Sequence, residues 1–206
     1  MYIPAHFRET RLNVLHALIR EHSFGTLVSH VNGQLFATHL PFLLDPTRGA
    51  NGTLMAHMAR ANPHWQQLPR SESLAIFQGP HAYISPAWYV SEETVPTWNY
   101  SVVHAYGTAT LLDDPERIRA LLDETVGTFD THGWSTARVS DRYVANMARG
   151  IVAFEIPIAR LEGKRKLGQN RPVDDVDGAV AGLRAIGDVD SLAVAEDMQE
   201  AARSRR

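Results

Sequence analysis

Polar and aromatic side chains occupy four stretches of this sequence in which the hydrophobic pattern otherwise predicts buried strands. The stretches are FATHLPFLL (36–44), HMARANPHW (57–65), GPHAYISPAWY (79–89) and VPTWNYSVVHAYG (95–107). A buried polar group without a partner costs about 1 to 3 kcal/mol, so each of these groups needs one. Two explanations stay open. Either the groups hydrogen-bond one another in turns and caps, or they surround a planar, amphipathic ligand with an anionic tail.

The two lysines of the chain lie close together in the sequence. Lys164 and Lys166 both belong to LEGKRKLGQNR (161–171), and every other basic side chain apart from histidine is an arginine. In a protein whose other basic residues are arginines, lysines without a specific function are expected to be replaced by arginine. The pair therefore indicates a function for this segment, with two solvated surface lysines as the alternative.

Several kinds of catalytic site are missing from the sequence. It has no GxGxxG after a strand, no Walker lysine, no GxSxG and no HExxH. Because it has no cysteine, disulfides, thiolate metal sites and cysteine nucleophiles are excluded, and redox chemistry would need a bound cofactor. The ten histidines show no metal-ligand spacing. We assign no metal and no catalytic residue.

Composition limits the class of protein. The 206 residues are 44% hydrophobic, enough for one sizeable core or two small ones, and the formal net charge is −3. Residues 1–171 contain 15 acidic and 16 basic side chains, so this part lacks the excess of positive charge that would neutralise nucleic-acid phosphates. The apolar runs are too short to cross a bilayer and Met1 opens no signal segment. We expect a soluble, cytoplasmic chain.

Periodicity predicts the elements that must position the polar groups. Strand patterns predict a hairpin around the Asn32-Gly33 turn, whose second strand runs over 35–44, and about six strands in all. Helical spacing predicts helices over 9–22, from Asn62-Pro63, over 113–129, over 140–147 and after Pro172. The βαβ alternation of a parallel sheet is absent. A closed or split antiparallel barrel flanked by helices is therefore favoured.

The four stretches and LEGKRKLGQNR together resemble the PaiB family, FMN-binding negative transcriptional regulators of the FMN-binding split-barrel superfamily. The likeness runs from MYIPAHF through THLPF, ARANP, GPHAYISPAWY and VPTWNY to the QNR segment. One position departs, because Gly168 stands where the family usually has serine. The resemblance implies an α+β, mainly β fold, a six-stranded antiparallel split β-barrel flanked by helices. The resemblance covers residues 1–171, which would form the FMN-binding split-barrel domain, and helical spacing predicts residues 172–206 as a C-terminal helical extension of the same domain.

The resemblance also implies FMN as the cofactor and a homodimer with the flavin at its interface. The phosphate would be received by a basic side chain, with Thr38 or a nest of backbone amides. Aromatic rings would cover the dimethylbenzene edge of the flavin, amides would bind its pyrimidine edge, and His39 or His57 would place a donor near N1. The expected basic residues are Arg60, Lys164, Lys166 and Arg171. The expected aromatic residues are Tyr83, Trp98 and Tyr100, and the amides are Asn62, Asn99, Gln169 and Asn170.

Three functions follow from a flavin-binding chain, and whether it is an enzyme stays open. The resemblance implies transcriptional repression. Direct repression needs a recognition helix on a basic surface. The helix predicted over 11–20 is a poor candidate for it. The terminal arginines 203, 205 and 206 or a dimer face would therefore have to contact DNA. The alternative is an FMN-dependent oxidoreductase reduced by NADH or NADPH. A flavin-storage or redox-sensing module that acts through a regulatory protein is the third function.

Overall fold

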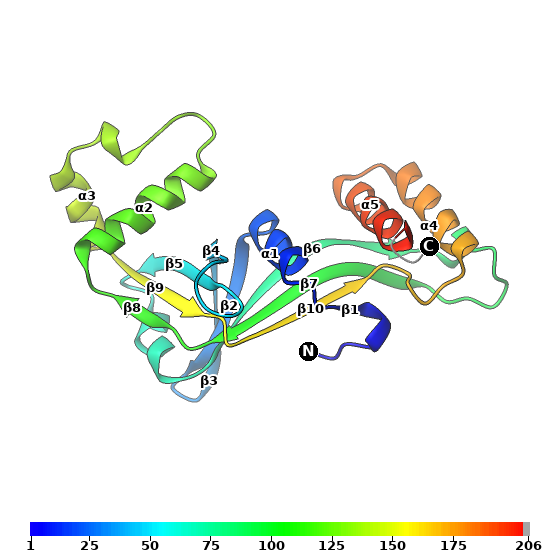
Figure 1. Ribbon diagram of the computed structural model, residues 1–206, viewed down its shortest axis with the longest axis horizontal. Helices are drawn as coiled ribbons and strands as arrows, with labels where there is room; N and C mark the ends of the chain where they lie inside the picture. The colour runs from blue at the N-terminus through cyan, green and yellow to red at the C-terminus, as the bar shows by residue number, and fades with distance from the viewer. Residues whose placement is uncertain (204–206) are drawn as a thin grey trace. The chain divides into compact units, whose positions relative to one another are not determined.

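The computed structural model describes residues 1–203 as ten strands in two sheets and five α-helices (Figure 1). The helices are α1 (Leu12–Glu21), α2 (Pro115–Phe129), α3 (Asp141–Ala148), α4 (Val173–Ile186) and α5 (Val189–Arg203). The strands are β1 (Arg8–Glu9), β2 (Phe24–Val31), β3 (Gln34–Pro41), β4 (Leu43–Asp45), β5 (Thr53–Ala59), β6 (Ser73–Ile84), β7 (Thr97–Gly107), β8 (Thr110–Leu112), β9 (Ile151–Pro157) and β10 (Arg160–Lys166).

The predicted fold class is confirmed. Six strands form one sheet in the order β1-β10-β7-β6-β2-β3, and four form a second in the order β4-β5-β9-β8. The pairs β1 with β10, β2 with β3 and β6, and β5 with β4 and β9 are antiparallel. Because β1 and β3 remain edge strands in the described part of the chain, the sheet is not closed.

The chain forms two compact units. The first unit contains residues 1–18, 78–103 and 162–206, and the second contains 19–77 and 104–161. Residues 172–203 thus share a unit with the ends of β6, β7 and β10. None of the helices in residues 1–203 has the length and apolar character that a bilayer span requires.

The first unit packs α4 and α5 against one face of its strands. Ala82 and Ile84 of β6 join a buried cluster with Leu183 of α4 and Met198 of α5. Burial alternates strictly along β7, because successive side chains of a strand point to opposite faces, and along β6 it alternates with one change of phase at Pro80 and His81. One face of these strands is therefore covered by the two helices.

The second unit contains the predicted hairpin and the helices α2 and α3. Asn32 and Gly33 both have positive φ, 53° and 81°, as a two-residue hairpin turn requires. Asp114 and Ser140 cap α2 and α3 through their side chains, which confirms both predicted helix starts.

The strand predicted over 35–44 is wrong in one respect, because it is two strands that belong to different sheets. Pro41 ends β3, since proline has no N–H to continue the ladder. The amide N–H of Phe42 then donates to the carbonyl of Ser23 at 2.9 Å before β4 begins.

Candidate functional site

Aromatic and lysine side chains gather on the face of the first unit that α4 and α5 leave uncovered. The six residues are His81 and Tyr83 of β6, Trp98 and Tyr100 of β7, and Lys164 and Lys166 of β10. We call them the aromatic-lysine face. The Trp98 ring centroid lies 6.1 Å from those of both His81 and Tyr83. Trp98 is 53% exposed and Tyr83 is 44% exposed, so large aromatic surfaces are open here.

The two lysines lie beside these rings. Lys164 is buried, with its ammonium 5.1 Å from the Tyr100 ring centroid and 5.7 Å from that of Tyr2. Lys166 donates to the hydroxyl of Thr97 and, at 2.6 Å, to the backbone carbonyl of Trp98. Both acceptors are neutral oxygens. Lys166, one of the two lysines that the sequence singled out, is therefore hydrogen-bonded to the first two residues of β7, the strand that carries Trp98.

Positive charge accumulates around Lys166. Burial lowers the pKa of Lys166, and the charges of Lys164 and Arg171 lower it further. An anion bound beside the ammonium would offset this repulsion, because an opposite charge favours the protonated form. Arg171 itself stacks 4.6 Å from the Tyr89 ring centroid. The predicted phosphate-binding residues Lys164, Lys166 and Arg171 thus come together in one unit.

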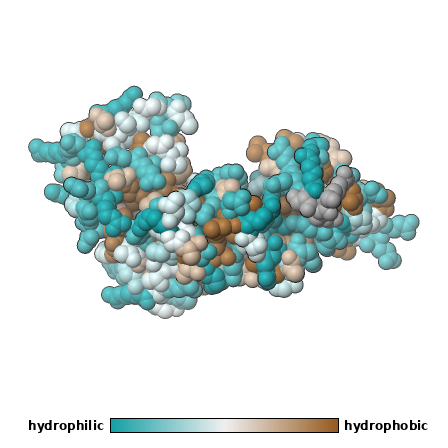
Figure 2. Space-filling model, viewed as in Figure 1, coloured by the Kyte–Doolittle hydropathy of each residue, from teal (hydrophilic) through white to brown (hydrophobic). Residues whose placement is uncertain are grey.

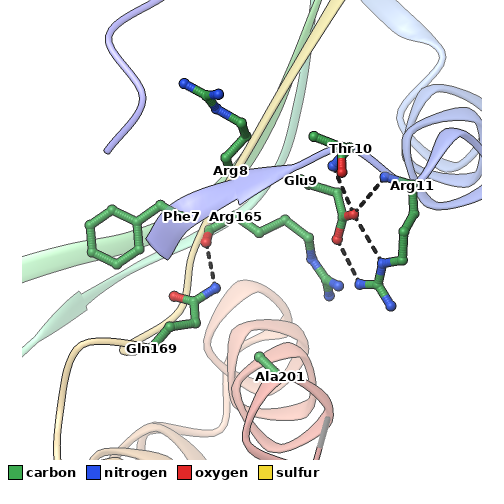
Figure 3. A pocket seen from close by; sticks show the side chains of 8 residues that line it. All are labelled: Phe7, Arg8, Glu9, Thr10, Arg11, Arg165, Gln169 and Ala201. Atoms are coloured by element: carbon green, nitrogen blue, oxygen red, sulfur yellow. Dashed lines mark hydrogen bonds and ion pairs between the residues drawn. The ribbon is translucent and has the colours of Figure 1, made fainter. Parts of the chain in front are cut away.

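Asn99 and Gln169, two of the three predicted amides in the first unit, form hydrogen bonds to other residues of that unit. Asn99 is buried on the helix-covered face and donates to the sulfur of Met198 at 3.3 Å. Gln169 accepts from the N–H of Leu167 at 2.8 Å and donates to the carbonyl of Arg165 at 2.7 Å, as Figure 3 shows for the second bond. Asn170, in contrast, is exposed. The structure therefore leaves Asn170 as the open amide of this loop.

Gly168 begins this loop in a backbone conformation that suits glycine. Its φ is +83°, in the left-handed region that other residues adopt only with strain. The absence of the family's usual serine is therefore compatible with the local backbone, and in this chain position 168 supplies a turn rather than a hydroxyl.

A pocket of the first unit is lined by Glu9 and several arginine side chains (Figure 3). Its volume is about 320 Å³. Arg11 donates to both carboxylate oxygens of Glu9, at 3.0 and 2.6 Å, and Arg165 binds Asp197 at 2.8 Å. Because these guanidinium groups are paired with carboxylates, the pocket attracts a phosphate less than Lys164 and Lys166 do.

Thr38 and Asn62 belong to a hydrogen-bond network of the second unit. His64, which sequence reasoning did not select, is fully buried at its centre. Its ring nitrogens lie 2.8 Å from the Thr38 hydroxyl and 2.6 Å from that of Ser29. Asn62 donates to the Thr38 hydroxyl at 3.1 Å and caps the following 3-10 helix by accepting from the His64 N–H. In this network the polar side chains hydrogen-bond one another, as the first of the two explanations predicts. The Asn62-Pro63 pair indicated this arrangement in the sequence, because it predicts a helix cap.

The remaining predicted residues lie apart within the second unit. Exposed His39 contacts the Thr26 hydroxyl at 3.0 Å. Arg60 donates to the backbone carbonyls of Arg149 and Ile151, at 2.8 and 2.7 Å, and so holds the connection between α3 and β9. His57 lines an apolar cavity. Nothing in these contacts tests whether the three side chains bind a flavin, which stays a prediction.

The fold defines the class of protein. It is shared with the flavocytochrome Anf3 from Azotobacter vinelandii, with a TM-score of 0.66 and 15% identity over 86% of this chain and 77% of that chain. It is also shared with the FAD and heme binding protein from Mycobacterium smegmatis, with a TM-score of 0.61 and 17% identity over 85% of this chain and 80% of that chain. At these identities the likeness shows the fold alone, a split barrel.

Sequence similarity gives the family. Residues 1–160 match the family described as "Putative FMN-binding domain". The "Protease synthase and sporulation protein PAI 2" of Bacillus subtilis is 34% identical over an alignment of 206 positions, which covers 97% of each of the two chains. The chain therefore belongs to the PaiB family of FMN-binding split-barrel proteins. The predicted family and the predicted cofactor, FMN, are both confirmed.

Proposed function

We propose that this chain binds FMN on the aromatic-lysine face, with the phosphate beside Lys166 and Lys164 and the ring system against Trp98 and Tyr83. The observation that carries the proposal is that Lys164 and Lys166 lie on the same face as the rings of Trp98 and Tyr83, which are about half exposed. FMN has the matching shape, since a dianionic phosphate is joined through a ribityl chain to a flat ring system with an apolar dimethylbenzene edge. When bound, its isoalloxazine ring supplies one- or two-electron redox chemistry.

The side chains of this face would act on the cofactor in distinct ways. The Lys166 ammonium has three donors, of which two go to Thr97 and the Trp98 carbonyl, so a third can reach a phosphate oxygen. Lys164 adds charge from a buried position, where electrostatic interactions are screened less. Trp98 and Tyr83 would exclude water from the flavin ring.

A homodimer is part of the proposal. Besides Trp98 and Tyr83, Val90 and Val95 of the first unit are 71% and 67% exposed. Apolar side chains of this size favour a partner surface, and a second copy would cover both them and the flavin. Light scattering after size exclusion should give twice the chain mass, and a monomer in the presence of excess FMN would contradict this part of the proposal.

We propose further that any effect on transcription acts through a regulatory protein. The described helices α4 and α5 have exposed acidic side chains in their first turns, at Asp174 and Asp190, which would repel DNA phosphates. Residues 205 and 206 of the terminal arginine cluster lie outside the described residues. A gel-shift titration across salt checks the proposal, because sequence-selective retention at physiological ionic strength would show direct repression instead.

The oxidoreductase remains the second candidate, because bound FMN would supply the redox chemistry that it requires. Rapid mixing of the FMN-loaded protein with NADH or NADPH should bleach the flavin absorption if a nicotinamide is the electron donor. No bleaching with either would remove this candidate and leave FMN binding intact.

FMN binding itself is tested first. Freshly purified protein should be yellow, and mass spectrometry of the heat-released cofactor should identify FMN. Protein that is colourless, and that neither quenches nor shifts the fluorescence of added FMN, would overturn the proposed function.

A further inference from the structure

His81 has no role in the proposed function, although it lies on the aromatic-lysine face. Its side chain is exposed, and its ring centroid lies 6.1 Å from that of Trp98. Tyr83 lies at the same distance from Trp98, so β6 places an imidazole and a phenol beside the same indole. Apolar and hydrophilic residues share the surface of the first unit, as Figure 2 shows for one side of the molecule. A ligand that covers Trp98 would therefore meet a polar ring and a phenol ring next to it.

Strand β6 is irregular beside His81. Burial along the strand changes phase at Pro80 and His81, so Gln78 and His81, three positions apart, are both exposed. In a regular strand, side chains three positions apart point to opposite faces. Here the two side chains meet, with the amide nitrogen of Gln78 3.4 Å from Nδ1 of His81. Irregularities of this kind re-aim side chains and are frequent beside functional sites. This one brings an amide next to the aromatic-lysine face.

The contact between Gln78 and His81 leaves one donor and one acceptor open. An amide nitrogen can only donate, so Nδ1 of His81 is the acceptor. The neutral imidazole then carries its hydrogen on Nε2. Within residues 1–203, no hydrogen bond engages Nε2 of His81 or the amide oxygen of Gln78. The pair thus presents an N–H donor and a carbonyl acceptor to a ligand.

The two ends of the isoalloxazine ring differ in their hydrogen-bonding groups. The pyrimidine edge has the N3–H donor and the N1 and carbonyl acceptors, whereas the dimethylbenzene edge has neither kind of group. Building on the proposed function, we propose that His81 and Gln78 bind the pyrimidine edge of FMN. Nε2 of His81 donates to N1 or to the adjacent carbonyl, and the Gln78 oxygen accepts from N3–H. Tyr83 then covers the apolar dimethylbenzene edge.

His81 and Gln78 take roles that the sequence assigned to other residues. His39 and His57, expected near N1, belong to the second unit, and Asn99 is buried against α5. A donor near N1 favours reduced flavin, in which negative charge collects at this atom. His81 therefore raises the reduction potential of the bound flavin, besides orienting its ring.

Titration of the full chain with FMN and with 3-methyl-FMN, followed by flavin fluorescence, tests the assigned acceptor. A methyl group on N3 removes the donor, so wild-type protein should bind 3-methyl-FMN about tenfold more weakly than FMN. In Gln78→Ala the acceptor is absent and space opens, so the two affinities should agree within about twofold. Gln34→Ala removes an exposed amide of β3 in the second unit and should keep the wild-type difference.

The reduction potential of the bound flavin tests the assigned donor. His81→Phe keeps an aromatic ring and removes Nε2, so reduced FMN should lose about tenfold more affinity than oxidised FMN. For a two-electron couple, this factor lowers the midpoint potential by about 30 mV. Equilibration with a reference dye measures the potential. The control variant His30→Phe, at an exposed position of β2 in the second unit, should leave it unchanged.

The comparison of the two flavins in wild-type protein needs no substitution, so it holds even where a variant fails to fold. Equal binding of FMN and 3-methyl-FMN would overturn the assignment of the pyrimidine edge, as would an unchanged potential in folded His81→Phe. Either result leaves FMN binding by the chain intact. Wild-type protein that binds neither flavin would overturn the proposed function itself, and this inference with it.

Discussion

The ammonium of Lys166 lies 2.6 Å from the backbone carbonyl oxygen of Trp98. This bond joins the last residue of β10 to the strand that presents the exposed indole. A single contact therefore sets the distance between the positive charge and the aromatic surface, the two features that a flavin nucleotide needs.

Removing this ammonium should weaken FMN binding. We expect Lys166→Ala to lower the affinity tenfold or more, because one charge-assisted hydrogen bond to a phosphate is worth about 1.5 to 3 kcal/mol. Quenching of FMN fluorescence on titration gives the dissociation constant. Arg184→Ala removes one positive charge from exposed α4 surface in the same unit and serves as the matched control. Equal affinities for both variants would contradict the assignment of the phosphate end.

Truncation of the exposed indole should change the flavin spectrum without unfolding the protein. Trp98 is 53% exposed, so Trp98→Ala removes little buried area and should shift the melting temperature by only a few degrees. The absorption band of bound FMN should move toward that of free FMN, because ring cover is lost. Trp98→Phe retains a ring and should lie between the two, whereas an unperturbed band in Trp98→Ala would show that the indole does not contact the flavin.

A buried carboxylate should make stability depend on pH. Burial raises the pKa of Asp175, but hydrogen bonds from Ser91 and the Val90 N–H, together with the charge of Arg171, outweigh it and leave the pKa lowered. A lowered folded-state pKa contributes stability that is present above the unfolded value, about 3.9, and is lost as pH falls through the folded pKa. Asp175→Asn should reduce the melting temperature at pH 7 by on the order of 5 °C.

The same comparison at lower pH tests the sign. The difference in melting temperature between wild type and Asp175→Asn should shrink as pH falls below about 4. A difference that grows toward acid pH would contradict the ionised state of Asp175.

Two helix glycines should respond to alanine with opposite signs. In α4, a Cβ at Gly178 would lie 2.0 Å from the Trp88 carbonyl oxygen, whereas at Gly127 in α2 it would meet open space. Alanine is the better helix former by up to about 1 kcal/mol, so Gly127→Ala should stabilise the protein modestly. Gly178→Ala should destabilise it, because backbone must move to admit the methyl group. Urea denaturation measures both, and stabilisation by Gly178→Ala would show that Trp88 does not pack there.

The sequence by itself determined the hairpin turn, the starts of two helices and the family, because each can be recognised from short segments of the chain. Asn32-Gly33 requires positive φ at both positions, and Asp114 and Ser140 can cap only the residues that directly follow them. The order of rare residues in the four polar stretches was enough to indicate the PaiB family.

Only the tertiary structure decided which of the selected side chains are open to a ligand. Asn99 and Trp98 are neighbours in the sequence, yet Asn99 is buried against α5 and Trp98 is exposed, because helices about a hundred residues further along the chain cover one face of β7. Thr38 found its partner in His64, 26 residues away. Strand periodicity shows that two faces exist, but packing between distant segments determines which face is covered.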